Sequence, residues 1–209
     1  MKQCIVLMGT QHVGKTSLGK GLAEKLGVPF FDTDQMVTKN YGKHICVFAE
    51  EKGYEEGYNW AETSVIRILV EKFINAKPIS AVISTGSRFC GDTPGIEELR
   101  KIADFYWIDG NIELGAKRLM EEATTDPEKA NPYLRKNGKF YNVYFSIPQI
   151  TSLEEIRVRH LKNASSSLEQ YAKIADFTVR PKDAPLEENV QLLYDTIPWK
   201  QFSFLQQAV

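Results

Sequence analysis

The sequence predicts an α/β protein with three layers, α/β/α, around a mainly parallel central sheet. Short apolar or β-branched runs alternate with segments of helical periodicity, at the spacing typical of successive βαβ units. A glycine-rich loop separates the first apolar run from the first helical segment, as in phosphate-binding folds. The 209 residues, of which 43% are hydrophobic, are enough for a single domain with a buried core.

The first half of the chain begins with a predicted strand and a predicted helix. Cys4 to Met8 is a continuous apolar run, and Ser17 to Leu26 carries leucines at every fourth position, which places them on one helix face. A short apolar stretch, Pro29 to Phe31, follows. Residues 35–76 are expected to be largely helical, with a break near residues 53–57.

The second half continues the alternation. The expected elements are a buried strand at 79–83, a helix at 94–101, a strand at 105–109, a helix at 112–122, a strand at 177–179 and a closing helix at 186–193. The stretch from about Ala123 to Gln149 breaks this rhythm with prolines, a glycine and clustered aromatics. Long irregular segments inside a domain are usually functional, so we predict a lid insertion here. A disordered loop, or a segment packed down by its aromatics, is the alternative.

Composition narrows the classes of function. The net charge is −1 and the pI is near 6.3, so a nucleic-acid partner is not expected. No apolar run approaches the ~18 residues of a membrane span, and no signal-peptide pattern follows Met1. Three widely spaced cysteines fit neither a disulfide framework nor a zinc site. We therefore expect a monomeric cytoplasmic protein.

The strongest motif lies in the first loop. Gly9-x-x-x-x-Gly14-Lys15-Thr16 matches the P-loop pattern between an expected strand and an expected helix. The glycines let backbone N–H groups converge on phosphate oxygens, and the helix that continues with Ser17 adds its positive end. Lys15 supplies charge to the outer phosphates and the Thr16 hydroxyl a magnesium ligand. The sequence therefore predicts a P-loop NTPase fold in which these five residues bind ATP and Mg²⁺.

Beyond the P-loop, the chain resembles the shikimate kinase family over roughly residues 3–195. The resemblance rests on Leu18-Gly19-Lys20-x-Leu22-Ala23, Leu26-Gly27, Phe31-Asp32-Thr33-Asp34, Phe48-x-x-x-x-Gly53, Gly57-Tyr58-Asn59-x-x-Glu62, Ser84-Thr85-Gly86 and Tyr171-x-x-x-Ala175-Asp176. It implies an ATP-dependent kinase that transfers a phosphoryl group to a hydroxyl of a small metabolite.

The resemblance also assigns roles to two aspartates. It implies that Asp32 supports Mg²⁺ and that Asp34 engages the acceptor hydroxyl. The chemistry agrees, because one carboxylate near a P-loop can hold a magnesium-bound water and a second can orient or deprotonate the attacking hydroxyl. The alternative is that Asp32-Thr33-Asp34 is only a turn and helix cap.

The acceptor site departs from the family's pattern. Asn59 stands where the family has a carboxylate-binding arginine, and residues 163–167 contain no arginine where the family has the second. The glycine turn that touches substrate hydroxyls reads Gly86-Ser87-Arg88, and the lid's Arg-Pro reads Asn131-Pro132. Asparagine and serine cannot form the two-pronged pair that arginine makes with a carboxylate. We therefore expect an altered acceptor site that includes Asn59, Gly86, Ser87 and Arg88.

Three arginines are further candidates. Arg88 ends a strand facing the same crevice, so it either restores the lost charge or is an ordinary solvated arginine. Arg118 matches a family arginine near the adenine, and Arg135 lies in the expected lid, where it could contact the triphosphate. For both of these the alternative is surface charge.

Two classes of function follow from these residues. Intact Lys15, Thr16, Asp32 and Asp34 favour a small-molecule kinase acting on a hydroxylated acceptor. The altered acceptor site favours the alternative, a catalytically degenerate ATP-binding relative that acts as a nucleotide sensor or partner-binding protein.

Overall fold

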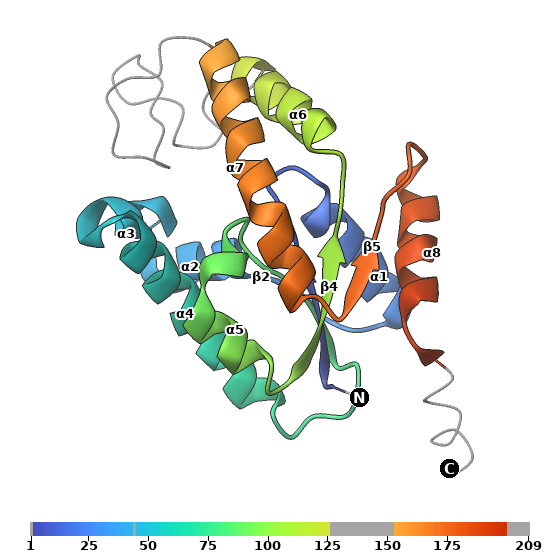
Figure 1. Ribbon diagram of the computed structural model, residues 1–209. Coiled ribbons are helices and arrows are strands. Elements are labelled where there is room, and N and C mark those ends of the chain that lie inside the picture. The colour runs from blue at the N-terminus through green and yellow to red at the C-terminus, as the bar shows by residue number, and fades with distance from the viewer. Residues whose placement is uncertain (1, 44, 126–152, 200–209) are drawn as a thin grey trace.

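The computed structural model describes residues 2–43, 45–125 and 153–199 (Figure 1). Its strands are β1 (Cys4–Met8), β2 (Phe30–Asp32), β3 (Ala81–Ser84), β4 (Ala103–Ile108) and β5 (Phe177–Val179). Its helices are α1 (Lys15–Leu26), α2 (Thr33–Tyr41), α3 (Ile45–Lys52), α4 (Tyr54–Phe73), α5 (Thr93–Leu99), α6 (Ile112–Thr125), α7 (Leu153–Ile174) and α8 (Leu186–Thr196), with a 3-10 turn η1 (Phe89–Gly91).

The five strands form one parallel sheet in the order β2-β3-β1-β4-β5. The predicted parallel alternation is therefore confirmed. The first strand, β1, is central, and it pairs with β3 on one side and β4 on the other. This order places the loops after β2 and β3 on one side of the P-loop, and the loops after β4 and β5 on the other.

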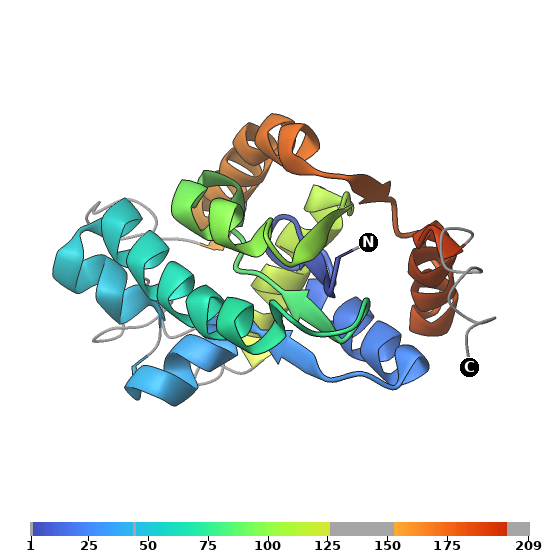
Figure 2. The same cartoon turned by 90° about the horizontal axis from the view of Figure 1, so that it is seen from below.

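Helices cover both faces of the sheet, which gives the three predicted layers (Figure 1 and Figure 2). Successive side chains of a strand point to opposite faces. Val6 and Met8 pack into a core with apolar residues of α4, α5 and α7, whereas Ile5 and Leu7 pack with residues of α1 and α8. The residues of β1 and β3 are buried on both faces, as expected for a parallel sheet, whereas the edge strands β2 and β5 are less buried.

The expected helical stretch 35–76 consists of three helices rather than two. Gly42 ends α2 with a left-handed φ of 63°, a break that the sequence interpretation missed. Gly53 precedes α4 as expected, but Gly57 continues the helix and its N–H donates to the Gly53 carbonyl at 2.8 Å. The helices α2, α3 and α4 pack against one another around a small hydrophobic core of their own.

The segments around the expected lid need separate mention. Residues 123–125 end α6, and the rest of the expected lid, with Asn131-Pro132 and Arg135, lies outside the described residues. The long helix α7 ends at Ile174, three residues after Tyr171, where a helix was expected. Within the described ranges, no helix is both long and apolar enough to cross a membrane.

Candidate active site above the P-loop

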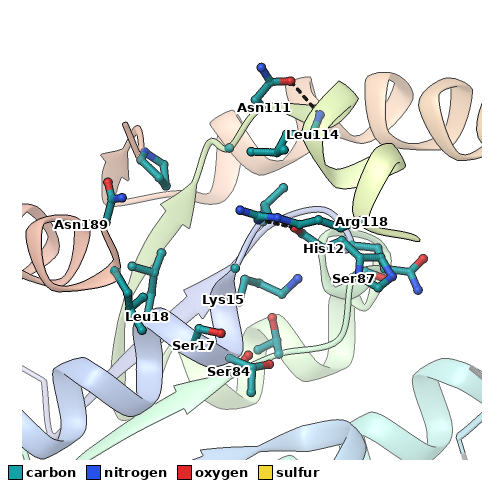
Figure 3. A pocket seen from close by; sticks show the side chains of 18 of the residues that line it. His12, Lys15, Ser17, Leu18, Ser84, Ser87, Asn111, Leu114, Arg118 and Asn189 are labelled. Atoms are coloured by element: carbon teal, nitrogen blue, oxygen red, sulfur yellow. Dashed lines mark hydrogen bonds between the residues drawn. The ribbon is translucent and has the colours of Figure 1, made fainter. Parts of the chain in front are cut away.

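A cavity of about 1100 Å³ lies above the loop between β1 and α1 (Figure 3). Such a position, at the carboxyl ends of parallel strands, is where open α/β sheets bind their ligands. We call the wall formed by Asp34, Tyr58, Ser84, Thr85 and Ser87 the β2–β3 side. The wall formed by residues 110–118 and 181–189 is the β4–β5 side. In Figure 3, Asn189 lies on one side of Lys15 and Ser87 on the other.

The P-loop glycines have separate structural roles. Gly14 adopts a φ of 98° at the start of α1 and lines the cavity, with its backbone at the positive end of the helix. Gly9 packs beneath the loop, because a Cβ at that position would lie only 2.7 Å from the carbonyl oxygen of Ile108. It therefore shapes the loop and does not itself line the cavity. Ser17 lines the cavity from the first turn of α1.

Lys15 is buried at the centre of the cavity floor. Its Nζ donates a hydrogen bond to the Thr10 carbonyl oxygen at 2.7 Å. Burial lowers the pKa of Lys15 to about 8, against the nearby carboxylates of Asp34 and Asp32, which raise it. The ammonium therefore stays protonated at pH 7, within a cavity that can receive an anionic group.

Thr16 and Asp32 form a pair of hard oxygen groups beside Lys15. The Thr16 hydroxyl donates to Asp32 Oδ2 at 3.0 Å, and Asp32 Oδ1 accepts from the Gln35 N–H at 3.2 Å, which caps α2. Asp32 also lies opposite Ser84 in the β2–β3 pairing. Hydroxyl and carboxylate oxygens suit Mg²⁺, which usually takes few protein ligands and keeps water and phosphate oxygens. The described residues contain no cluster of three or more His, Cys, Asp or Glu that could hold a metal without such additions.

Asp34 lines the same cavity as the P-loop, from the first turn of α2. Its Oδ1 is buried, and no described residue donates a hydrogen bond to it. Burial, and then the charge of Asp32, raise the pKa of Asp34 to about 6, against the lowering effect of Lys15. A buried acceptor without a donor requires an explanation. A hydroxyl group of a ligand in the cavity would supply that donor.

Glu62 supports the β2–β3 side from behind. Its side chain is 2% exposed, and its Oε1 accepts hydrogen bonds from the Thr33 hydroxyl and the Gly86 N–H, both at 2.7 Å. A Cβ on Gly86 would lie 3.1 Å from Asp34 Oδ1 and 3.2 Å from both carboxyl oxygens of Glu62, so glycine makes room for both acids. Burial, then Asp34 and Asp92, raise the pKa of Glu62 to about 8.

Glu62 belongs to one of the motifs of the family resemblance, but no role was predicted for it. The spacing of Tyr58 and Glu62 could have indicated a role for Glu62 near the site, because residues four apart lie on the same face of a helix.

Replacing Glu62 tests this support. Glu62→Ala should lower the melting temperature, because the Thr33 hydroxyl loses its acceptor and the Gly86 N–H keeps only the Thr33 hydroxyl oxygen at 3.1 Å, at a cost of about 1–3 kcal/mol. Glu62→Gln keeps an acceptor oxygen and should largely retain stability. The raised pKa adds a pH test: stability from this group is greatest below the unfolded pKa near 4.5 and is lost as pH rises to about 8. Wild-type stability should therefore fall across this window relative to Glu62→Gln. Equal stability of the alanine and glutamine variants would contradict the assignment.

The β4–β5 side is built from one arginine and one loop. Arg118 lines the cavity, and its Nη1 donates to the His12 carbonyl oxygen in the P-loop at 3.1 Å. The loop 181–185 is held by Asn189, whose side chain is 8% exposed. The Lys182 N–H donates to Asn189 Oδ1 at 2.7 Å, and Asn189 Nδ2 donates to the carbonyl oxygens of Lys182 and Ala184 at 3.1 Å. Sequence analysis did not predict this loop as part of the site.

The Asn189 contacts predict that this residue affects ATP binding but not the rate of phosphoryl transfer. Asn189→Leu keeps a similar volume but removes the bonds that shape loop 181–185. We expect KM for ATP to rise about tenfold, equivalent to about 1.4 kcal/mol, with kcat nearly unchanged. Steady-state kinetics with ATP varied would measure this. Gln191→Leu is the matched control, because Gln191 is on the same helix and its side chain bonds only to exposed Asp195. A fall in kcat at unchanged KM would contradict the prediction.

The other predicted residues lie at different distances from the cavity. Ser87 lines it, and its carbonyl oxygen accepts from the Tyr171 hydroxyl at 2.9 Å. Gly86 and Arg88 flank Ser87 but do not line the cavity. Asn59 lies beside η1, where its Nδ2 approaches the Gly91 carbonyl oxygen at 3.5 Å. Of the residues predicted for the acceptor, the structure therefore brings Asp34 and Ser87 to the cavity wall.

Known proteins resemble this chain in sequence and in fold. The family model described as shikimate kinase matches residues 11–197. A shikimate kinase of Persephonella marina is 33% identical over 135 residues, which span 65% of this chain and 74% of that protein. The structure of a shikimate kinase from Acinetobacter baumannii in complex with shikimate superposes with a TM-score of 0.70 at 23% identity, over 97% of both chains. A gluconokinase from Sinorhizobium meliloti gives a TM-score of 0.55 at 16% identity, over 100% of this chain and 98% of that one. At these identities the two structural likenesses show the fold alone.

Proposed function

The chain belongs to the shikimate kinase family and is an ATP-dependent kinase of a small hydroxylated metabolite; from this premise we propose how its cavity serves the transfer. The observation that carries the proposal is that Lys15 and Asp34 line one cavity. Lys15 offers a buried positive charge, and Asp34 offers a buried oxygen to which no described residue donates. Phosphoryl transfer needs a cation at the outer phosphates and a carboxylate at the attacking hydroxyl.

The triphosphate of ATP lies above the P-loop in this proposal. Gly14, Lys15, Thr16 and Ser17 contribute backbone N–H groups, a positive charge and the N-terminal end of α1. The adenine of ATP then lies on the β4–β5 side, between Arg118 and loop 181–185, because the β2–β3 side carries the Asp34 carboxyl group. Arg135 remains a candidate for the triphosphate and lies outside the described residues.

Thr16 and Asp32 would hold Mg²⁺ in this arrangement. Their hydrogen bond already brings a hydroxyl oxygen and a carboxylate oxygen together at 3.0 Å, and both are ligands that Mg²⁺ prefers. When bound, the cation neutralises charge on the outer phosphates during transfer. Asp32 is fixed for this role by the cap that it makes on α2.

Asp34 is the residue that we propose as general base. It accepts the proton of the acceptor hydroxyl as that oxygen bonds to the terminal phosphorus of ATP and the bond to ADP breaks. Lys15 remains charged throughout, because its pKa of about 8 is above neutral pH. The four residues with proposed roles in transfer all line one cavity: Lys15, Thr16, Asp32 and Asp34. This supports an active kinase rather than a degenerate nucleotide sensor.

An ATP-consumption screen tests the proposal. ADP release is measured with shikimate, quinate, gluconate and nucleoside monophosphates, each with and without EDTA. We expect release above background with one hydroxylated ring acceptor, loss of that release with EDTA, and no release with nucleoside monophosphates. Binding of ATP with equal ADP release in the presence and absence of every acceptor would contradict a kinase and favour the degenerate alternative.

A further inference from the structure

The β2–β3 side carries hydroxyl groups and a carboxyl group. Four of its five lining residues, Tyr58, Ser84, Thr85 and Ser87, bear hydroxyls, and the fifth is Asp34. Among the described residues that line the cavity, every cation lies elsewhere. Lys15 is in the P-loop, and Arg118 and Lys182 are on the β4–β5 side. The described residues that line this wall are therefore polar and carry no positive charge, and Arg88, which follows Ser87, does not line the cavity.

The side chain behind this wall is a buried carboxyl group rather than a cation, and its raised pKa of about 8 leaves it uncharged at pH 7. Glu62 is buried there and takes its hydrogen bonds from a hydroxyl and a backbone N–H. A neighbouring guanidinium would lower the pKa of a buried carboxyl, whereas burial, Asp34 and Asp92 raise the pKa of Glu62. A further carboxylate brought to this wall would meet two acids, Asp34 and Glu62.

The two helices beside the wall do not supply a cation at the positions nearest to it. On α4, Asn59 follows Tyr58 and directs its amide toward Gly91 in η1. On α7, Tyr171 bonds to Ser87, and one turn earlier the Ser167 hydroxyl bonds within the helix to the Asn163 carbonyl oxygen at 3.0 Å. Amides and hydroxyls bind neutral polar ligands but do not neutralise a carboxylate.

We infer that this kinase recognises its acceptor through hydroxyl groups alone, and that a neutral cyclic polyol binds better than the same ring bearing a carboxylate. The inference rests on the proposed function, because it takes the β2–β3 side as the acceptor's wall. Hydroxyl groups both donate and accept, so the four hydroxyl side chains and Asp34 can pair with vicinal hydroxyls of a ring. A carboxylate leaving water for this wall would find no opposite charge.

The test compares shikimate with its methyl ester, in which one methyl group removes the negative charge and the ring hydroxyls are unchanged. Each is titrated calorimetrically into the full chain with Mg²⁺ and a non-hydrolysable ATP analogue. We expect the ester to bind with a Kd at least tenfold lower than that of the acid. Equal affinity, or tighter binding of the acid, would overturn the inference. Binding of neither ligand would also overturn it, because recognition through hydroxyls requires that the ester bind.

A variant separates charge from shape. Ser87→Lys places an ammonium group on the wall itself, because Ser87 lines the cavity, and it should lower the ratio of acid Kd to ester Kd at least tenfold relative to Ser87→Gln. Ser87→Gln is the matched control, because it removes the same hydroxyl and adds a long side chain without charge. An equal ratio in the two variants would count against the absence of a cation as the cause of the preference.

Turnover is measured separately, in samples in which ATP replaces the non-hydrolysable analogue. ADP release with the ester supports both the inference and the proposed function. Tight ester binding without ADP release from ATP would support the inference and reject the proposed transfer, so the two can fail independently.

Discussion

Replacing Lys15 with methionine should lower kcat by about 10²–10³-fold, the loss that follows removal of one preorganised charge-stabilising group. Lys15 is central to the cavity floor and carries its charge at pH 7. Methionine has a similar length and no charge, so the variant removes the electrostatic contact while filling the same space. Single-turnover kinetics at saturating ATP and acceptor would measure the effect on chemistry.

The same variant should not destabilise the protein without nucleotide. Burial lowers the pKa of Lys15 from 10.5 to about 8, so folding disfavours its charged form. This penalty is present below about pH 8 and disappears as pH rises toward the unfolded value. At pH 7, Lys15→Met should therefore melt at the wild-type temperature or above it. Lys20→Met, on the exposed face of α1, is the control and should change neither property. Turnover of Lys15→Met within about threefold of wild type would contradict the assignment.

The features that the sequence predicted well are those set by local chemistry. The P-loop could be predicted directly from the sequence, because its turn requires glycine at defined positions and its positive charge comes from a lysine at a fixed position, Lys15. The inner strands β1 and β3 were predicted because each is a short apolar run buried on both faces. Strand ends moved by one or two residues, as in β4, since hydrogen-bonded pairing rather than side-chain type sets where a strand ends.

The features that the sequence did not predict depend on contacts between distant segments. Glu62 lies 24 residues before Gly86, and its role arises only when α4 packs beside the end of β3. Asn189 holds loop 181–185 through backbone groups, which any sequence of that loop would present. The break at Gly42 was missed because a lone glycine in a helical pattern does not by itself mark an end. Asn59 was expected at the acceptor, but its side chain is directed toward η1 and not into the cavity.

Replacing Asp34 with asparagine should preserve ATP binding and suppress transfer. Asparagine keeps the shape of the side chain but cannot accept the hydroxyl proton, and a positioned general base typically contributes ~10²–10⁴-fold to the rate. We therefore expect kcat to fall by this factor, with the Kd of ATP within about threefold of wild type. Asp183→Asn is the matched control, because Asp183 lines the β4–β5 side and undergoes the same chemical change. That control should keep its rate.

The pH dependence of the rate gives a second, independent signature of Asp34. A base must be ionised to accept a proton, and burial raises the pKa of Asp34 to about 6, so wild-type activity should fall as pH drops through that value. Bound Mg²⁺ stabilises the carboxylate, which moves this limb to lower pH in the nucleotide complex. Asp34→Asn should lose the limb altogether and show a flat residual rate over the same range. If the variant instead loses affinity for ATP and Mg²⁺ while keeping its rate at saturation, Asp34 is a metal residue and the acceptor hydroxyl is deprotonated elsewhere.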